Sequence, residues 1–271
     1  MTFETPPEPK NPVNGAYMVI EIQNLTINYF QEGHGQDALV LHGWGCNIQT
    51  VMPIINLIKN HYKTTAVDLP GFGDSSKPSE PYDSYDYANI IKQLIDNLGL
   101  KDIVLIGHSH GGRISIILSS QYPNLVDKLI LIDSAGIVPK RSMKYYIKVH
   151  SFKAMKKLYL ILNPGKDKSQ SLERFYERHG SEDYRQSDGV MRQTMVKVIN
   201  DDLGHLLRKI KAPTLLVWGE NDDATPLSDG KIMEKEIRDS GLIVIKGAGH
   251  YSYIDDFQTF KLVISSFLNI N

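Results

Sequence analysis

Short apolar runs, each bounded by polar or glycine-containing segments, recur along this chain of 271 residues. Runs of this length fit strands that are buried on both faces, as in parallel sheets covered by helices. Two earlier runs, Tyr17–Ile22 and Leu25–Phe30, indicate strands at the start of the same sheet. The buried runs are Ala38–Leu41, Thr64–Val67, Ile103–Ile106, Leu129–Ile132, Thr214–Trp218 and Leu242–Ile245. Together the runs predict a mostly parallel, eight-stranded sheet.

Helical patterns lie between these runs. One has apolar residues at positions 87, 90, 91, 94, 95 and 98, with Ser84 as the expected N-cap and Gly99 as the C-terminal stop. The last helix presents apolar residues on one face: Phe257, Phe260, Ile264, Phe267 and Leu268. Buried strands that alternate with amphipathic helices form βαβ units, so the fold class is α/β, with helices flanking the sheet.

The interval from Ile132 to Pro213 spans about 80 residues without the pattern of a buried strand. A crossover between parallel strands needs only about a dozen residues. From Gly136 to Lys211 the chain has 17 Lys and Arg against 8 Asp and Glu, whereas the remainder has 13 against 23. We therefore expect a flexible tail over 1–15, an α/β core formed by 16–135 and 211–271, and a helical cap over 136–210, inserted after the sixth strand.

The composition excludes several classes of protein. A net charge of −1 argues against general nucleic-acid binding. The N-terminus is Pro-rich and lacks the apolar region of a signal peptide, and no apolar run is long enough to span a membrane. The single cysteine, Cys46, cannot form an internal disulfide. We therefore predict a cytoplasmic monomer or homodimer that acts on a small molecule, inserts into no membrane and needs no cofactor.

The strongest motif is Gly107-His-Ser-His-Gly111, which directly follows the strand Ile103–Ile106 and precedes a helical segment ending near Gln121. A strand, Gly-x-Ser-x-Gly and a helix form the context of a nucleophile elbow. Such a turn holds the hydroxyl of Ser109 above the sheet at a helix N-terminus, where a developing negative charge is favoured. Ser109 is therefore the candidate nucleophile.

A serine hydroxyl needs a base to take its proton, and a histidine base needs an orienting carboxylate. His250 follows the strand Leu242–Ile245, so it lies at the same sheet edge as the elbow. Asp222 and its neighbour Asp223 follow the strand Thr214–Trp218, and Asp133 follows Leu129–Ile132. We expect Asp222 to be the acid, with Asp223 and Asp133 as alternatives. The order Ser, Asp, His is the one expected when the serine occupies a nucleophile elbow of this kind.

The loop His42-Gly-Trp-Gly45 follows the strand Ala38–Leu41 at this edge. Its glycines allow close approach to a substrate, and we expect the backbone N–H groups of Trp44 and His110 to form an oxyanion hole. His42, Gly43 and Tyr251 are candidate substrate-binding residues. His42, His108 and His110 lie near the nucleophile, yet no carboxylate or cysteine spacing accompanies them, so we predict no metal site.

These motifs together resemble the α/β-hydrolase fold superfamily, in its serine-nucleophile branch with a helical cap. The resemblance runs from about Tyr17 to the C-terminus. Its further markers are Asp68-Leu-Pro-Gly-Phe-Gly-Asp-Ser75, Trp218-Gly-Glu-Asn-Asp222 and Gly247-Ala-Gly-His250. The resemblance implies a cap that covers the active site. It argues against epoxide hydrolases and haloalkane dehalogenases, which carry aspartate at the elbow. His110 departs from many relatives, which have Met, Phe, Gln or Leu there.

The expected activity is hydrolysis of a small ester through an acyl-enzyme, with a Ser-His-Asp triad. A C–C bond or thioester hydrolase is an alternative, and the basic cap favours an anionic substrate for it by electrostatic steering. A ligand receptor or stress-signalling protein that retains the triad is an alternative of another class, and a lyase without an acyl-enzyme is a further one.

Overall fold

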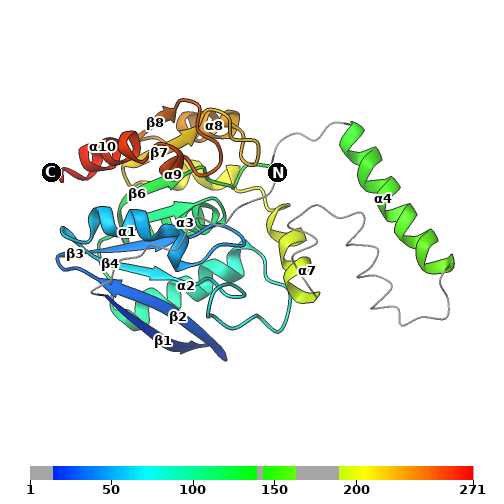
Figure 1. The fold of residues 1–271 in the computed structure, drawn as a ribbon, viewed down its shortest axis with the longest axis horizontal. Coiled ribbons are helices and arrows are strands. Elements are labelled where there is room, and N and C mark those ends of the chain that lie inside the picture. Colours follow the sequence, from blue (N-terminus) through cyan, green and yellow to red (C-terminus); the bar gives the residue numbers. More distant parts are fainter. Residues whose placement is uncertain (1–14, 139–142, 163–188, 271) are drawn as a thin grey trace.

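The computed structural model describes residues 15–138, 143–162 and 189–270. In this part of the chain, eight strands form one sheet in the order β1-β2-β4-β3-β5-β6-β7-β8. The strands β1 and β2 pair antiparallel, as do β2 and β4, and every later pair is parallel. The strands are β1 (Ala16–Ile22), β2 (Leu25–Glu32), β3 (Gln36–Leu41), β4 (Tyr62–Val67), β5 (Ile103–His108), β6 (Val126–Ile132), β7 (Thr214–Gly219) and β8 (Ser240–Ile245). The predicted α/β class and mostly parallel sheet are confirmed (Figure 1).

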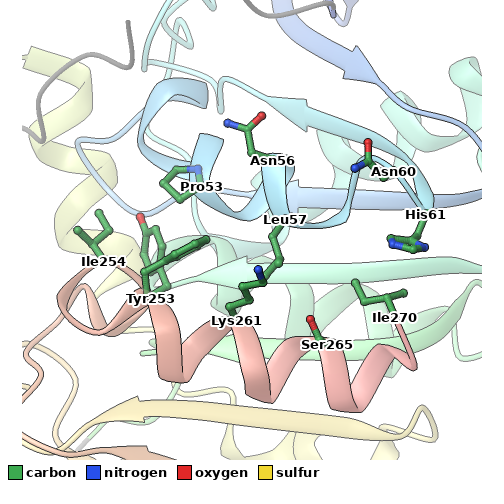
Figure 2. Close-up of a pocket in the computed structure, with 11 residues that line it drawn as sticks. Pro53, Asn56, Leu57, Asn60, His61, Tyr253, Ile254, Lys261, Ser265 and Ile270 are labelled. Carbon is green, nitrogen blue, oxygen red and sulfur yellow. The ribbon is translucent and has the colours of Figure 1, made fainter. Parts of the chain in front are cut away.

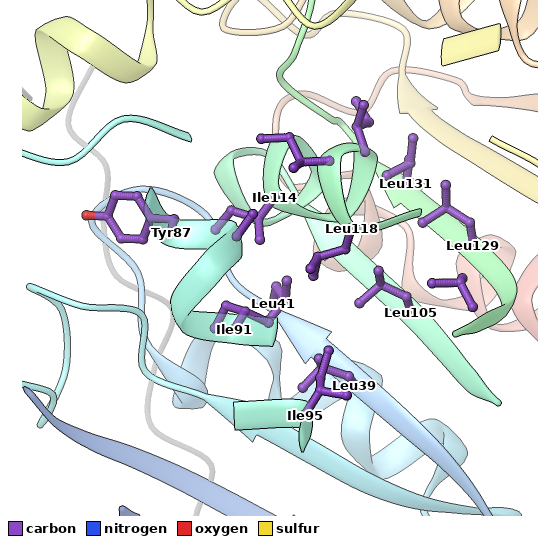
Figure 3. Packing of buried hydrophobic residues seen from close by; sticks show 14 of the residues in the cluster. Leu39, Leu41, Tyr87, Ile91, Ile95, Leu105, Ile114, Leu118, Leu129 and Leu131 are labelled. Carbon is purple, nitrogen blue, oxygen red and sulfur yellow. The ribbon is translucent and has the colours of Figure 1, made fainter. Parts of the chain in front are cut away.

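Helices cover both faces of the sheet, which explains why its central strands are apolar throughout. On one face, α2 (Ser84–Leu98), α3 (His110–Gln121) and α8 (Leu227–Glu236) pack in a large buried cluster. Figure 3 shows Ile91 of α2 and Leu118 of α3 among strand residues of this cluster. The other face is covered by η1 (Ile48–Val51), α1 (Met52–Ile58), α9 (Ser252–Asp255) and α10 (Phe257–Leu268). The residues of the candidate site follow the carboxyl ends of the parallel strands β3, β5, β7 and β8.

The N-terminus of α2 differs by one residue from the prediction. Asp83, not Ser84, is the N-cap: its side chain accepts hydrogen bonds from the backbone N–H groups of Tyr85 and Asp86. The Asp86 carboxylate in turn accepts from the Asp83 N–H, which completes a capping box with an acidic residue at its third position. Aspartate and serine are both good N-caps. The hydrogen bond from the Asp83 N–H to the Asp86 carboxylate selects Asp83. The stop at Gly99 is confirmed, with φ of 65°.

Two helices and a short 3-10 segment lie within the described part of the predicted cap: α4 (Met143–Leu162), α7 (Gly189–Val198) and η2 (Gly204–Lys209). In Figure 1, α4 stands apart from the sheet, whereas α7 lies beside it. The C-terminal end of this region is tied to the core. Arg113 Nη1 of α3 donates to the Asp201 carbonyl, and the Asp201 carboxylate accepts from Ser84 N–H. The predicted tail lies outside the described residues except for residue 15.

The elbow requires glycine at Gly111 because α3 begins against the backbone of β3. A Cβ on Gly111 would lie 2.2 Å from the Leu41 carbonyl oxygen, which is far inside contact distance. A Cβ on Gly241, in β8, would meet no atom within 4 Å. We therefore expect Gly111→Ala to lower the free energy of unfolding by about 3 kcal/mol, and Gly241→Ala to leave it unchanged within about 0.5 kcal/mol. Urea unfolding of both variants checks this, and equal effects would contradict it.

Candidate active site

Ser109 occupies a strained turn between β5 and α3. Its φ of 52° and ψ of −111° lie outside the regions that non-glycine residues favour. The surrounding backbone fixes this conformation: Ser109 N–H donates to the Ile132 carbonyl, and Ser109 carbonyl accepts from Ala135 N–H, each over 3.0 Å. The strained backbone is thus fixed by hydrogen bonds to β6 and to the residues that follow it. The serine side chain is partly exposed and lies at the N-terminus of α3.

Ser109, His250 and Asp222 form one hydrogen-bonded chain. His250 Nε2 lies 2.9 Å from Ser109 Oγ, and His250 Nδ1 lies 2.9 Å from Asp222 Oδ2. The carboxylate accepts the Nδ1 proton, which leaves Nε2 free to accept the proton of the serine hydroxyl. These groups come from the ends of β5, β7 and β8, which the parallel sheet brings to one edge.

The carboxylate of Asp222 is held by its own loop. Oδ1 accepts from the N–H groups of Ala224 and Thr225, and Oδ2 accepts from Thr225 Oγ1 over 2.7 Å. Burial alone would raise the pKa of Asp222, but the hydrogen bonds and charge of His250, together with those from Thr225, lower it below its ordinary value. Asp222 is therefore anionic at neutral pH. The Asp222 carboxylate contacts the His250 ring, whereas the Asp223 side chain is exposed to solvent. Thr225 was not predicted as a site residue, because a threonine three residues after an aspartate forms no recognisable sequence motif.

Asp133, the third candidate acid, is fully buried and has a different set of partners. Its Oδ2 accepts from Ser252 N–H and Oγ, and its Oδ1 accepts from Gly219 N–H. Its carbonyl oxygen lies 2.9 Å from Thr225 Oγ1, whose one proton is donated to Asp222 Oδ2 in the shorter contact. The Asp133 carboxylate therefore joins the end of β6 to the end of β7 and to the turn after His250. It supports the site instead of contacting the His250 ring through a hydrogen bond.

The buried Asp133 makes stability depend on pH. Burial raises its pKa to about 7, against the hydrogen bonds from Ser252 and Gly219, which lower it. A raised carboxyl pKa means that the folded state binds a proton that the unfolded state has released, so stability falls as pH rises from about 4 to about 7. We expect wild type to lose about 2 kcal/mol relative to Asp133→Asn between about pH 5 and about pH 8.

Urea unfolding of both proteins at the two pH values measures this difference, in which the other titrating groups cancel. Asp239→Asn, at an exposed aspartate, is the matched control and should follow wild type. Parallel pH curves for wild type and Asp133→Asn would show that Asp133 does not titrate in this window.

The loop after β3 lies against the nucleophile. A Cβ on Gly43 would be 2.9 Å from His108 Nδ1 and 3.2 Å from Ser109 Cβ, so a larger residue would force these neighbours to shift. Trp44 follows Gly43 directly, and its ring packs edge-on against His110 with centroids 5.5 Å apart. His110 is the first residue of α3, so its N–H is one of the helix donors without an intrahelical acceptor. The loop of Gly43 and Trp44 therefore lies beside Ser109, and the assignment of the Trp44 and His110 N–H groups as oxyanion donors stays a prediction.

His42, a candidate substrate-binding residue, lies buried at the base of this loop. Its side chain is fully buried, Nε2 accepts from Leu69 N–H, and Nδ1 lies 2.7 Å from the Gly43 carbonyl, to which it donates. Both ring nitrogens are thus used within the protein, and the ring supports the loop of Gly43 and Trp44. A histidine next to a glycine-rich loop has the same sequence pattern whether it faces the substrate or holds the loop, and a contact of His42 with substrate stays a prediction.

The two histidines of the elbow, His108 and His110, are also buried. His110 packs against Tyr87 and Trp44, and neither of its ring nitrogens has a hydrogen-bond partner among the described residues. Burial, then the charge of Arg113, lowers its pKa well below the ordinary value, so His110 is neutral and does not titrate near neutral pH. No group of three or more His, Cys, Asp or Glu residues able to hold a metal occurs in the described ranges.

Tyr251, the last candidate substrate-binding residue, is partly exposed beside the triad. Its ring centroid lies 5.7 Å from that of His250 and 5.1 Å from that of His108, and its hydroxyl lies 3.5 Å from Cys46 Sγ. Cys46 is buried. A cavity of about 650 Å³ lies nearby, between α1 and the helices α9 and α10. Figure 2 shows side chains of these helices facing it, among them Leu57, Tyr253 and Lys261. None of the triad residues lines it.

The fold and the site define an α/β hydrolase. The family model described as alpha/beta hydrolase fold matches residues 39–257, so the chain belongs to this family. The AB hydrolase superfamily protein YisY of Bacillus subtilis is 28% identical over 269 residues, covering 94% of this chain and 99% of YisY. The 2-hydroxy-6-oxononadienedioate/2-hydroxy-6-oxononatrienedioate hydrolase 1 of Pseudomonas putida is 26% identical, covering 90% of this chain and 92% of the relative.

Among solved structures, a membrane phospholipase A superposes with a TM-score of 0.73 at 25% sequence identity, covering 94% of this chain and 86% of that one. Within the described residues of our protein, no helix combines the length and apolar character needed to cross a membrane. The relatives therefore agree on the fold and on hydrolysis, and differ in the compounds that their names specify.

Proposed function

We propose that this protein is a serine hydrolase that cleaves a small carboxylic ester through an acyl-enzyme. The observation that carries the proposal is the chain of hydrogen bonds from Asp222 through His250 to Ser109, with 2.9 Å at each of the two contacts of the histidine. A nucleophile, a base and an orienting acid in this order are what acyl transfer requires. The phospholipase among the similar structures, an ester hydrolase by its name, supports the same reaction.

In the proposed reaction, Ser109 Oγ attacks the carbonyl carbon while its proton passes to His250 Nε2, and Asp222 stabilises the resulting imidazolium. The negative charge on the former carbonyl oxygen is stabilised by the N–H groups of Trp44 and His110. The intermediate collapses to an acyl-serine, and His250 gives its proton to the departing alkoxide. A water molecule then attacks the acyl group, gives a proton to His250, and releases the carboxylic acid as the proton returns to Ser109.

We further propose that residues 136–210 form a cap over this site. Its C-terminal end is held beside the elbow helix by the bond from Arg113 to Asp201, and Thr194 Oγ1 of α7 accepts from Tyr82 N–H. On α4, the large apolar side chains of Met155 and Leu158 are 46% and 56% exposed, which suits a surface that meets substrate or the core. Such a cap excludes water and shapes the substrate pocket.

An anionic substrate is the second candidate, with a thioester or C–C bond hydrolase as the activity. Residues 136–211 carry 17 basic against 8 acidic side chains, and the named substrates of the Pseudomonas putida relative are dioates, which carry two carboxylates. A basic cap attracts anions and raises their association rate, an effect that salt weakens. Measuring kcat/KM for a neutral and an anionic ester of the same acyl group over a salt series separates the two candidates.

The experiment that tests the main proposal combines labelling with turnover. Intact-mass spectrometry after treatment with a fluorophosphonate is expected to show one adduct on wild type and none on Ser109→Ala, and wild type should hydrolyse many equivalents of a short p-nitrophenyl ester. Adduct formation without sustained turnover would favour a ligand receptor, or a lyase. Absence of any adduct on the folded wild type would overturn the proposed nucleophile. The cytoplasmic localisation and the monomeric or homodimeric state of the protein stay predictions.

A further inference from the structure

The residue before the nucleophile contacts the backbone of the catalytic histidine. His108, the last residue of β5, is 1% exposed, and its Nε2 lies 2.8 Å from the carbonyl oxygen of His250. A carbonyl oxygen only accepts hydrogen bonds, so Nε2 of His108 carries the proton and donates it. The bond joins two residues that are 142 positions apart in the sequence.

The His108 ring is held in this neutral form. Burial, and then the charge on a protonated His250, lower its pKa to about 3. Its proton therefore stays on Nε2 while His250 becomes an imidazolium during the reaction. Its other nitrogen, Nδ1, is buried and has no hydrogen-bond partner among the described residues. The nitrogen that makes the contact to His250 is thus the one polar anchor of the ring in the described part of the chain.

His108 also touches the other parts of the site. A Cβ on Gly43 would lie 2.9 Å from His108 Nδ1, so the ring packs directly against the loop that precedes Trp44. The ring also meets the aromatic residues after His250, with centroid distances of 5.1 Å to Tyr251 and 5.2 Å to Tyr253. The ring therefore lies between the loop of Gly43 and the loop of His250, and its backbone leads directly into Ser109.

The loop of His250 is held at several other points. Asn221 N–H donates to the Ala248 carbonyl, Gly249 N–H donates to Asp255 Oδ2, and Ser252 N–H donates to Asp133 Oδ2. These bonds fix the residues before and after His250. The bond from His108 fixes the peptide group of His250 itself, and that peptide sets the direction in which the imidazole leaves the backbone.

We propose that His108 is a positioning residue of the hydrolytic reaction: its Nε2–H holds the His250 peptide so that the imidazole of His250 meets both Ser109 Oγ and Asp222. The proposal rests on the proposed function, since it assigns His108 a role in the same triad. His108 touches no reacting atom and acts only through His250. A displacement of a reacting group by about 1 Å lowers rates by about 100-fold, so the loss of this bond should appear in kcat.

Two amides of different length test the assignment. Glutamine places its side-chain N–H2 near the position of histidine Nε2, whereas asparagine places it near Nδ1. His108→Gln is therefore expected to keep kcat within about 5-fold of wild type, and His108→Asn to lower kcat by about 10- to 100-fold with KM within about 3-fold. Thermal unfolding of both variants is measured alongside, because both substitutions replace the same buried ring and a purely structural role would affect both.

A second readout does not depend on activity. In wild type, nitrogen NMR of the histidine rings should show a protonated Nε2 and a bare Nδ1 for His108, and the low-field proton of the His250–Asp222 bond should persist in His108→Gln and weaken in His108→Asn. A bare Nε2 on His108, or equal kcat values and equal low-field signals in the two variants, would overturn the inference. Failure of wild type to react with the fluorophosphonate would instead count against the proposed function, and the NMR result would still decide the inference.

Discussion

Replacing His250 with alanine will lower kcat for ester hydrolysis by about 10⁶-fold, and adding Ser109→Ala to that variant will lower it little further. The reason is that the two side chains act as one unit. Without His250 Nε2 at 2.9 Å, the hydroxyl of Ser109 has no acceptor for its proton. Without Ser109, the base has nothing to activate in the first step. Steady-state kinetics of both single variants and the double variant measure this.

The matched controls for this cycle are residues of the same types outside the site. His61 is exposed and Ser265 lies on α10, and both line the cavity between α1 and α10, not the triad. His61→Ala and Ser265→Ala should keep kcat within about 2-fold of wild type. Additive losses for His250→Ala and Ser109→Ala, each contributing its full effect in the double variant, would mean that the two residues do not belong to one triad.

Replacing Asp222 with asparagine will lower kcat by about 10⁴-fold, whereas the same change at Asp223 will have little effect. An asparagine at 222 presents either an amide N–H2, which cannot accept the proton of His250 Nδ1, or an uncharged oxygen, which stabilises the imidazolium less. The first orientation forces the wrong tautomer of His250, and the second keeps the tautomer but removes the charge that stabilises the imidazolium. Asp223 is exposed and adjacent in sequence, which makes it the matched control.

The two variants also decide between the acids that the sequence left open. Circular dichroism and thermal unfolding should show both variants folded, because Thr225 still binds the side chain at 222 through its hydroxyl and its N–H. A large loss in Asp223→Asn with activity retained in Asp222→Asn would reverse the assignment. Loss in neither variant would direct attention to Asp133, whose carboxylate is already bound by Gly219 and Ser252.

The fold could be predicted from the sequence because its signals are local. Each buried strand is a short apolar run with a breaker on each side, and the motif at Ser109 requires a strand before it and a helix after it. The parallel arrangement then brings the ends of β5, β7 and β8 to one edge without any further information. For this reason the residues of the candidate triad could be named, and their separation of 2.9 Å at each contact could not.

What could not be predicted depends on contacts between distant segments. Thr225 contacts Asp222 and the Asp133 carbonyl only because β6 and β7 are neighbours. His42 supports its loop because Leu69, after β4, supplies an N–H to its ring. Whether a polar side chain meets solvent, substrate or backbone is decided by such partners. The buried roles of His42 and His108 were therefore outside what the residue pattern alone could predict.

The separation of Ser109 from His250 along the chain, 141 residues, has a consequence for synthesis of the protein. At about 5–20 residues per second, a ribosome needs roughly 7 to 28 seconds to translate the interval between them. During this time the elbow and the strands up to β7 can form, but the base is absent, and it follows β8, the last strand, at the edge of the sheet. A chain that ends before His250 would therefore carry Ser109 without its proposed base, and we expect fluorophosphonate reactivity only from chains that extend beyond His250.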